Sequence, residues 1–371
     1  MNRHIYFLCG AKDFHAMDKF RLTADAVGVD NITLITDTFE GEGQQCLVRP
    51  EYRVKPLLVI DRFTLARPSY LADIWRNIVK LAFLPLQTLR LRRLRGEVSQ
   101  AVVHAVPIYY MVLCWLAGIR FVGTPQGSEV LVRPGRSWAY RFFARRALRS
   151  AATVIVDSNA MRDAVRLLAD REAMVVKNGF DTAAALAAQA AAQTANEPRV
   201  RVVSMRGCQP LYRLHRIVAA RDAARVQPAI DFAYPAFAGN YLAAVRSRAR
   251  PDDAFHGMLP REQLYRMFAR ALLAVSIPTS DSSPRSVYEA IFCGAIVALT
   301  AEGFYDELPA CMRARVCLVD LDDPQWFDKA IEFARERSQT PYAPSPEALA
   351  LCDQQALIRR IVAEVYGLRG A

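Results

Sequence analysis

The 371-residue sequence lacks the short motifs that mark the commonest nucleotide, metal and hydrolytic enzymes. It has no Gly-x-Gly-x-x-Gly, Walker loop, His-Glu-x-x-His or Gly-x-Ser-x-Gly, which excludes the simplest dehydrogenase, kinase, zinc-protease and esterase interpretations. No two of its eight cysteines are spaced as in a zinc knuckle, and only five histidines are present, so we expect no structural metal site. The cysteines are scattered through apolar runs, which is typical of reduced thiols in a cytosolic protein.

Long apolar runs are also scarce. Residues 1–10 contain no apolar region long enough for a signal peptide. Residues 100–119 are twenty residues without a formal charge, which is the length of a membrane span. His104 and Pro107 near the start of this run favour a buried strand followed by a short helix, and a true span is the alternative.

Composition indicates a folded, two-domain protein with an uneven charge. Apolar residues make up 53% and charged residues 23%, which excludes a disordered or collagen-like chain, and the length exceeds what one core ordinarily serves. The net charge is +11, yet residues 1–150 hold 22 basic and 12 acidic residues while the remainder holds 26 and 25. The first part of the chain should therefore meet something anionic, such as a phospholipid surface, nucleic acid or a phosphorylated substrate.

Strand-like and helix-like segments alternate through both halves. Apolar runs without alternation are typical of strands covered on both faces, so we predict an α/β fold of two doubly wound, Rossmann-like parallel-sheet domains facing a cleft. The predicted strands are 5–9, 32–36, 101–106, 121–124, 153–157, 174–177, 200–205, 230–234, 254–258, 272–277, 295–300 and 316–320. The main helices predicted in the first half are 16–27, 71–94, 137–149 and 159–169.

A change of composition marks the domain boundary. Residues 182–198 are dominated by Ala and Gln and end in Asn-Glu-Pro, which predicts a surface helix leading into a linker. We therefore expect one domain over 1–182 and another over 199–345. Residues 346–371 are expected to include a helix that crosses back to the first domain.

The segment from 272 to 294 carries the most chemical information. A strand ends near Pro278, Ser283 can cap a helix that starts at Pro284, and Gly294 can end that helix. The loop before the helix therefore opens onto free amide N–H groups, which suit a phosphate.

Two carboxylates flank this helix start. Asp281 stands just before the helix, and Glu289 lies six residues beyond the expected cap, about 9 Å along the axis. A ligand with a sugar, a diphosphate and a ribose fits that separation, because each carboxylate can accept hydrogen bonds from a vicinal diol. The alternative is that Asp281 caps a turn and Glu289 lies on a solvated helix face.

The segment resembles the acid–seven residues–acid signature of the retaining GT-B glycosyltransferases of family 4, with Asp281 where many members have Glu. Further pieces occur in the order that the family has them. These pieces are 13–15 and 124–129 in first-domain loops, 154–158 with 177–181 at the end of that domain, 203–206 with 210–212 opening the second domain, and 255–257 at the base-pocket turn.

The resemblance implies roles for these residues. The second domain would bind a UDP- or GDP-linked sugar, and the first domain would bind the acceptor. Glu289 would bind the donor ribose. Asp281, beside the amides of Ser282 and Ser283, would bind hydroxyls of the transferred sugar, and Arg206 would neutralise the diphosphate.

The sequence departs from the family pattern near the diphosphate. The Lys that usually follows Arg206 by five residues is Leu211 here, so Arg213, or second Arg216, would take its place. Backbone groups of His256 and Gly257 would frame the base.

The acceptor side departs as well. A second His that many relatives have two residues after the first is Val106 here, so the catalytic His role falls to His15 or His104 or is absent. The alternative for His104 is a satisfied core histidine. The loop residues implied on the acceptor side are Gln126, Gly127, Ser128 and Glu129.

The implied chemistry needs no metal or other cofactor, because an arginine and a helix N-terminus can stabilise the charge on the leaving phosphate. The Asp320-Leu-Asp322 stretch imitates a metal-binding motif, but Asp323-Pro324 follows it and indicates a plain strand-to-helix loop. No residue is an obvious covalent nucleophile, which fits a front-face transfer with retention.

Basic residues gather in 76–95 and 133–149, and the second stretch mixes Arg with Trp138, Tyr140, Phe142 and Phe143. This mixture suits an anionic membrane surface, at about 1 kcal/mol per basic residue. A solvated helix face is one alternative. Nucleic acid is the other, but no recognisable binding module accompanies the charge, and we expect no nucleic-acid partner.

We therefore predict a metal-independent hexosyltransferase that is cytoplasmic and peripheral on the inner face of the plasma membrane. It would move a sugar from a nucleotide-sugar to a lipid-linked or polysaccharide acceptor in bacterial surface-polysaccharide or lipopolysaccharide biosynthesis. The alternatives are a nucleotide-sugar epimerase of the same architecture, against which the basic first domain argues, and a non-enzymatic basic scaffold.

Overall fold

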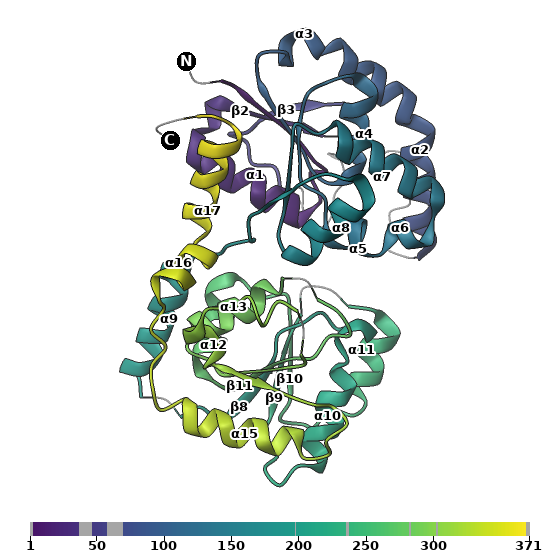
Figure 1. The fold of residues 1–371 in the computed structure, drawn as a ribbon. Helices are drawn as coiled ribbons and strands as arrows, with labels where there is room; N and C mark the ends of the chain where they lie inside the picture. The colour runs from purple at the N-terminus through teal and green to yellow at the C-terminus, as the bar shows by residue number, and fades with distance from the viewer. Residues whose placement is uncertain are drawn as a thin grey trace. The chain divides into compact units, whose positions relative to one another are not determined.

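In the computed structural model the chain divides into two units, the first comprising residues 1–177 with 355–371 and the second residues 178–354 (Figure 1). Each unit is built on one sheet, and all the described strand pairs are parallel. This confirms the predicted class of two doubly wound α/β domains. The structure describes residues 3–36, 47–57, 70–196, 198–234, 237–281, 283–301 and 303–368.

The sheet of the first unit has the order β3-β2-β1-β4-β5-β6-β7. The chain runs outward from β1 (Ile5–Leu8) and then crosses to β4 (Val102–Ala105) on the other side of β1. Ligands of doubly wound sheets bind at the carboxyl edge where the order reverses, here the loops after β1 and β4. The other strands are β2 (Ile32–Thr36), β3 (Arg53–Pro56), β5 (Val122–Gly123), β6 (Thr153–Val156) and β7 (Met174–Val175).

Helices cover both faces of this sheet. On β1, Ile5 and Phe7 face a core shared with α1 (Phe14–Val27), α17 (Gln354–Arg360) and the π-helical turn η4 (Ile361–Val365), while Tyr6 and Leu8 face the opposite core. The remaining helices of the unit are η1 (Val29–Asn31), α2 (Tyr70–Arg93), α3 (Arg95–Val98), α4 (Ile108–Ala117), α5 (Gly127–Leu131), α6 (Arg133–Arg136), α7 (Trp138–Ser150) and α8 (Asn159–Ala169).

The uncharged run 100–119 folds as β4 followed by α4, and most side chains of α4 are buried against the sheet. The strand–helix prediction is therefore confirmed over the alternative of a span. Within the part of the chain that the structure describes, no helix combines the length and the apolar character needed to cross a bilayer.

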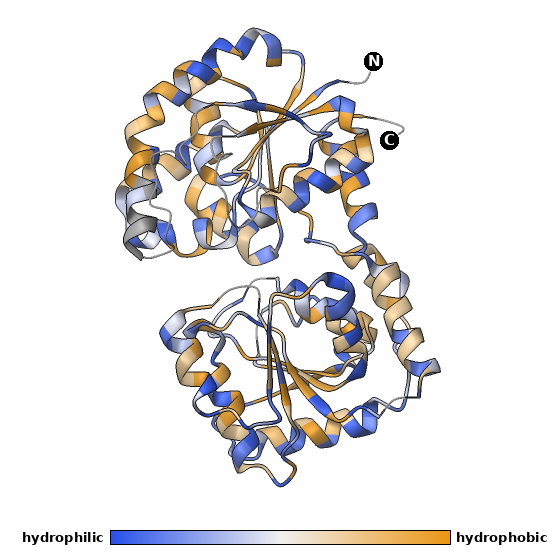
Figure 2. Cartoon of the chain, turned by 180° about the vertical axis from the view of Figure 1, so that it is seen from behind, coloured by the Kyte–Doolittle hydropathy of each residue, from blue (hydrophilic) through white to orange (hydrophobic). Residues whose placement is uncertain are grey.

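The sheet of the second unit has the order β10-β9-β8-β11-β12-β13. Its strand order reverses between β8 (Arg201–Ser204) and β11 (Ala271–Ser276), which are neighbours in the sheet. The outer strands are β9 (Ile230–Ala233), β10 (Ala254–Gly257), β12 (Val297–Leu299) and β13 (Val316–Leu318). Figure 2 shows the strands of both units largely in the orange of hydrophobic residues, as burial on two faces requires.

The helices of the second unit follow the predicted alternation. One core packs α12 and α13 with α9 against the sheet, and another packs α10 and α15 against its other face. The helices are α9 (Thr182–Thr194), η3 (Pro210–Tyr212), α10 (Leu214–Ala223), α11 (Gly239–Arg246), α12 (Arg261–Arg270), α13 (Arg285–Phe292), α14 (Ala310–Arg313), α15 (Trp326–Arg337) and α16 (Pro346–Cys352).

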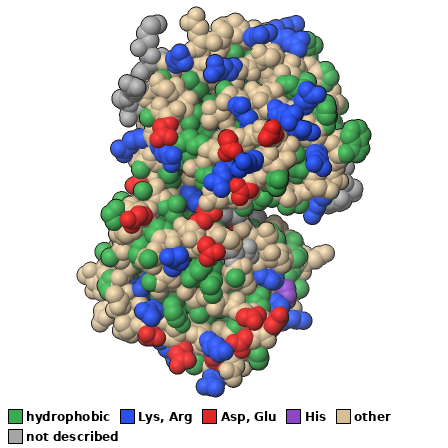
Figure 3. All heavy atoms as spheres, in the orientation of Figure 1, with side chains coloured by type: hydrophobic (Ala, Val, Ile, Leu, Met, Phe, Trp, Pro, Cys, Tyr) green, Lys and Arg blue, Asp and Glu red, His purple; other side chains and the backbone are tan. Residues whose placement is uncertain are grey.

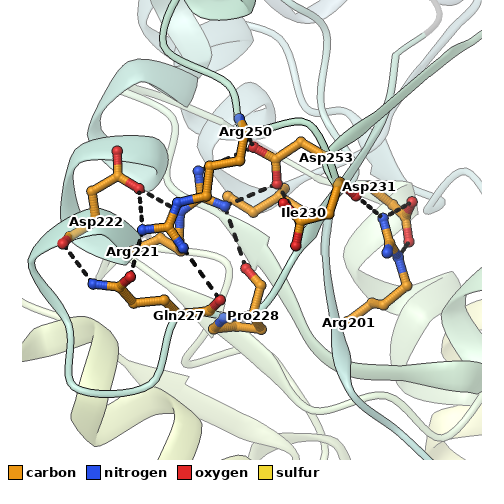
Figure 4. Close-up of polar contacts among 10 residues, drawn as sticks. Arg201, Arg221, Asp222, Gln227, Pro228, Ile230, Asp231, Arg250 and Asp253 are labelled. Atoms are coloured by element: carbon orange, nitrogen blue, oxygen red, sulfur yellow. Dashed lines mark hydrogen bonds and ion pairs between the residues drawn. The ribbon is translucent and has the colours of Figure 1, made fainter.

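A buried ion pair ties together the amino edge of this second sheet (Figure 4). Arg221, at the end of α10, is fully buried and donates to both carboxylate oxygens of Asp253, at 2.9 and 3.0 Å. The same carboxylate accepts the backbone N–H groups of Ile230 and Arg250, at 2.7 and 2.8 Å. Asp253 therefore joins a helix, a strand start and a loop at the edge opposite the loops that follow β8 and β11.

Candidate functional site

In the second unit, the loops after β8 and β11 are hydrogen-bonded to each other. The N–H of Thr279 donates to the carbonyl of Leu211 at 2.9 Å, and Nε of Arg213 donates to the carbonyl of Ile277 at 2.6 Å. Because the strand order reverses here, these loops occupy the position at which doubly wound sheets bind ligands.

Arg206 and Asp281 meet at this position from the two loops. One guanidinium nitrogen of Arg206 contacts the Asp281 carboxylate, and another donates to the hydroxyl of Ser286 at 2.9 Å. The guanidinium also lies 4.8 Å from the ring centre of Tyr212. The side chains of Arg206 and Asp281 are 13% and 14% exposed. Nε of Arg206 is buried, and none of the described residues accepts a hydrogen bond from it.

Helix α13 begins one residue later than predicted. Pro284 is its N-cap residue, with a non-helical ψ of 91°, and Arg285 is its first helical residue. Ser283 therefore does not cap the helix; its backbone N–H donates instead to the Asp281 carboxylate at 3.3 Å. This corrects the predicted start at Pro284, and it binds Asp281 to the turn that leads into α13. Ser282, predicted beside it, lies outside the described residues.

Glu289 lies on the inner side of α13 and is 5% exposed. Its Oε1 accepts from the Tyr265 hydroxyl and from Nε of Arg285, each at 3.1 Å, and Nε of Arg261 is 3.8 Å away. The alternative of a glutamate on a solvated helix face therefore does not hold. The carboxylate is a buried, charge-balanced acceptor, and a ligand hydroxyl would join an existing network.

Arg213 and Arg216, the two arginines considered in place of the missing lysine, donate hydrogen bonds to backbone carbonyls. The guanidinium of Arg213 donates to the carbonyls of Ile277 and Pro278 at the end of β11. Arg216 donates to the carbonyl of Leu321 at 2.9 Å. These contacts anchor the loops around Arg206, and a part for Arg213 in diphosphate binding stays a prediction.

The predicted base-pocket turn lies at the end of β10. Nε2 of His256 is 2.9 Å from the carboxylate of Asp231, and the carbonyl of Gly257 accepts the N–H of Tyr234 at 2.8 Å. Gly257 has a φ of +64°, a conformation that other residues adopt with strain. The turn is thus geometrically specific, and base recognition by it stays a prediction.

In the first unit, the loops after β1 and β5 are also joined. Nε2 of Gln126 donates to Asp13 at 2.7 Å, and Asp13 caps α1 by accepting the N–H groups of His15 and Ala16. His15 and Ser128 are exposed beside these helix starts, and Gly127 is half-buried. Most of the predicted acceptor-side residues therefore gather at the carboxyl edge of the first sheet.

Glu129 is placed differently from its neighbours. It is buried, and its Oε2 accepts the N–H groups of Gln126 and Ile108, each at 3.0 Å. Burial raises the pKa of this carboxyl, although the two N–H groups and Arg133 act in the opposite direction. Glu129 thus fastens the starts of α4 and α5 together and does not present its carboxylate at the surface.

His104 is a core residue. It is fully buried, with Nδ1 2.5 Å from the Tyr366 hydroxyl and Nε2 2.8 Å from the Thr124 hydroxyl. Burial, with a smaller contribution from Lys19, lowers the pKa of His104 well below its ordinary value, so the imidazole is neutral. Of the two histidines considered for catalysis, only His15 is placed where a ligand could reach it.

The Asp320–Asp322 stretch forms a turn between β13 and α15, as predicted, with the Asp320 carboxylate accepting the N–H of Asp322 at 3.0 Å. Helix α15 begins at Trp326, after Pro324. No group of three or more His, Cys, Asp or Glu is arranged around a metal position in the ranges that the structure describes.

Four contacts of the site were not predicted: Tyr212 and Ser286 on Arg206, and Tyr265 and Arg285 on Glu289. The contact of Arg285 could have been found in the sequence, because this residue precedes Glu289 by four positions on one helix face. The other three contacts depend on tertiary neighbours.

Residues 27–179 match a family model described as a glycosyl transferase 4-like domain. No curated protein matches the chain. Among solved structures, HepE of Anabaena in complex with UDP and glucose has a TM-score of 0.72 at 16% identity, over 99% of this chain and 100% of that one.

Other solved structures share the same architecture. Sucrose-phosphate synthase of Thermosynechococcus elongatus has a TM-score of 0.65 at 16% identity, over 98% of this chain and 100% of that one. The lipopolysaccharide outer core galactosyltransferase WaaB, in its apo form, has a TM-score of 0.62 at 9% identity, over 98% and 99%. The chain has the GT-B fold, and the family match supports a glycosyltransferase of the family 4 type.

Proposed function

We propose that this protein is a retaining, metal-independent hexosyltransferase that uses a UDP- or GDP-linked sugar. The observation that carries the proposal is the meeting of Arg206, Asp281 and the start of α13 where the strand order of the second sheet reverses. The UDP and glucose bound to HepE support a nucleotide-sugar donor. The activity named for WaaB supports an acceptor in surface-glycan biosynthesis, either lipid-linked or a polysaccharide.

The proposed reaction begins by exchanging one contact of Arg206. An entering diphosphate would displace Asp281 from the guanidinium, while Ser286 and the Tyr212 ring keep theirs. The released carboxylate could then accept hydroxyl hydrogens of the sugar. The bond between the anomeric carbon and the diphosphate breaks, the acceptor oxygen bonds to the same face of that carbon, and its proton passes to the leaving phosphate. Arg206 and the α13 N-terminus would stabilise the developing charge.

The first unit would bind the acceptor. The exposed side chains of His15 and Ser128, beside the joined loops of Asp13 and Gln126, offer hydrogen-bond donors and acceptors for a sugar or phosphate. Cytoplasmic placement on the inner face of the plasma membrane belongs to the same proposal.

Nucleotide release from a panel of UDP- and GDP-sugars tests the function, with Asp281→Ala as the informative variant. This variant should lose turnover while keeping its affinity for free UDP or GDP, because its proposed ligand is the sugar and its removal leaves Arg206 to the diphosphate. Asp322→Ala, whose side chain is 93% exposed in the same unit, is the matched control. Full turnover in Asp281→Ala would refute the assignment of Asp281 to the transferred sugar. An epimerase would convert the sugar without releasing nucleotide, and a scaffold would do neither.

Replacing Glu289 with Gln should weaken the binding of donor and of free nucleotide by the same factor, because the ribose is common to both. A hydrogen bond to a charged group contributes about 1.5–3 kcal/mol, so we expect a loss of about 10- to 100-fold, measured by titration calorimetry. Gln keeps the side-chain size where Ala would leave Arg285 and Arg261 beside a cavity. Tyr265→Phe is the control, since it removes the hydroxyl on Oε1 and leaves the carboxylate. Unchanged nucleotide affinity in Glu289→Gln would refute the ribose assignment.

A further inference from the structure

Helix α2 turns apolar side chains outward. Ile78, Leu81, Leu86 and Leu89 are exposed, Leu81 at 66%. Leu91 packs into the core from another side of α2. A surface helix of a globular protein ordinarily presents polar residues to water, so this apolar stripe lacks the pattern of a solvated face.

Helix α7 also exposes large apolar side chains, and arginines lie beside them. Trp138 is 85% exposed and Phe142 46%, and the guanidinium carbon of Arg146 lies 5.4 Å from the Phe142 ring centre. Arg141, Arg145 and Arg149 on the same helix are also exposed. The sequence from 130 to 150 contains no acidic residue. An aromatic residue and several arginines therefore share the outer side of one helix.

The two helices flank α4 in one layer of the first unit. Nζ of Lys80 on α2 lies 4.6 Å from the ring centre of Tyr109 on α4, and Trp115 on α4 lies 6.4 Å from Phe143 on α7. Figure 3 shows Lys and Arg side chains interleaved with hydrophobic ones over this part of the unit. The outer sides of α2 and α7, which we call the α2–α7 surface, are thus parts of one face.

We infer that the α2–α7 surface docks on an anionic phospholipid bilayer, with Leu81, Leu89, Trp138 and Phe142 entering the interface and the arginines of α7 contacting headgroups. Helices that lie in the interface combine an apolar side with aromatic and basic residues in this way. The charge argues for this occupant, since a solvated protein partner has no general need of arginines without acidic neighbours, whereas an anionic leaflet attracts each of them. The inference is independent of the proposed transfer reaction.

Flotation with vesicles tests the surface. Wild-type protein should float with vesicles of equal phosphatidylglycerol and phosphatidylcholine, and poorly with phosphatidylcholine alone. Leu81→Ser with Leu89→Ser should weaken attachment about tenfold or more, because exposed apolar area is removed without disturbing the core. Leu318→Ser, which changes an apolar residue of the second unit that is 44% exposed, should attach like wild type.

Removing positive charge from α7 provides a second test of the α2–α7 surface. Changing Arg141, Arg145 and Arg146 to Gln should lower affinity for the anionic vesicles about 100-fold while the circular dichroism spectrum stays that of wild type. Arg149 is left unchanged because its Nε donates to the carbonyl of Ala169 at 2.8 Å. Wild-type attachment should also fall as salt rises from 10 to 150 mM, where the Debye length shrinks from about 30 to 8 Å.

Three results would overturn the inference. The first is wild-type protein that does not float with anionic vesicles at low salt. The second is attachment that the leucine and arginine variants leave unchanged. The third is a wild-type dimer that Leu81→Ser with Leu89→Ser dissociates, which would assign the surface to a second copy of the chain. Nucleotide release from soluble donor, measured without vesicles, reports the proposed function separately from all three.

Discussion

Replacing Arg206 with alanine should lower the turnover number for nucleotide release by about 10²- to 10³-fold, the usual loss when one preformed donor to a developing negative charge is removed. Ser286 and the Tyr212 ring hold the guanidinium before any ligand arrives, and the entering diphosphate would exchange places with Asp281, so the donor is already directed at the site when charge develops. Steady-state measurements with the donor identified in the nucleotide-sugar panel give the turnover number and the Michaelis constant separately.

Arg213→Ala and Ser286→Ala are the controls for this result. Arg213 donates to backbone carbonyls at the end of β11, so its loss should lower the melting temperature more than turnover. Ser286 is one of the partners that orient Arg206, and removing its hydroxyl should cost turnover less than removing the charge. A larger fall in Arg213→Ala than in Arg206→Ala would mean that the diphosphate is bound at Arg213.

The sequence predicted the strands well for a specific physical reason. Strands buried on both faces must be apolar throughout, and runs such as β11 (Ala271–Ser276) are too short and too uniform for a surface helix. Strand β3 was missed because Arg53 and Lys55 occupy it, and charged residues of this kind are tolerated only on an edge strand. Its pairing to β2 depends on tertiary structure that no local pattern records.

Helix faces were harder to assign. Periodicity shows that α2 has an apolar stripe but not whether that stripe faces the sheet, and Leu81 is exposed whereas Leu91 is buried. The expected basic side of residues 137–149 is present on α7, yet the apolar contribution of α2 to the same face emerges only from their common packing on α4.

The candidate site was predictable where strand order determines it. Arg206 and Asp281 are 75 residues apart and meet because β8 and β11 are neighbours, which the doubly wound pattern implies. Burial of single polar side chains was not predictable. Glu129 and His104 occupy motif positions, but their partners Ile108 and Tyr366 come from other elements, and these contacts place both side chains in the interior.

Replacing Asp253 with alanine should destabilise the second unit by about 3 kcal/mol, the low end of the usual cost of breaking a buried ion pair, because Arg221 keeps a second, half-exposed partner in Asp222 at 2.7 Å. Both side chains of the Arg221–Asp253 pair are fully buried, and the carboxylate also accepts two backbone N–H groups. Calorimetry should show the transition of the second unit shifted to lower temperature while that of the first unit is unchanged. The melting temperature of Asp253→Asn should lie between those of wild type and Asp253→Ala, because the amide oxygen can still accept a hydrogen bond.

The Asp253 carboxylate also makes the stability of the second unit depend on pH. Burial alone would raise the pKa of Asp253, but hydrogen bonds from Arg221, Arg250 and Ile230 outweigh it and lower that pKa below its ordinary value. A group with a lowered folded pKa contributes stability above its unfolded pKa of about 3.9, and this contribution is lost as the pH falls through the folded pKa. Wild-type protein should therefore lose stability below about pH 4 more steeply than Asp253→Asn does.

Asp252→Ala is the matched control, because it removes an exposed carboxylate one residue away that forms no part of the buried pair. Surface changes of this kind usually alter stability by no more than about 0.5 kcal/mol. Nucleotide affinity should survive in Asp253→Ala below its melting temperature, since the pair lies at the amino edge of the sheet and Arg206 and Asp281 follow the carboxyl ends of its strands. Equal melting temperatures for Asp253→Ala and Asp252→Ala would show that water or backbone shifts compensate Arg221, and that the pair is not what holds this edge together.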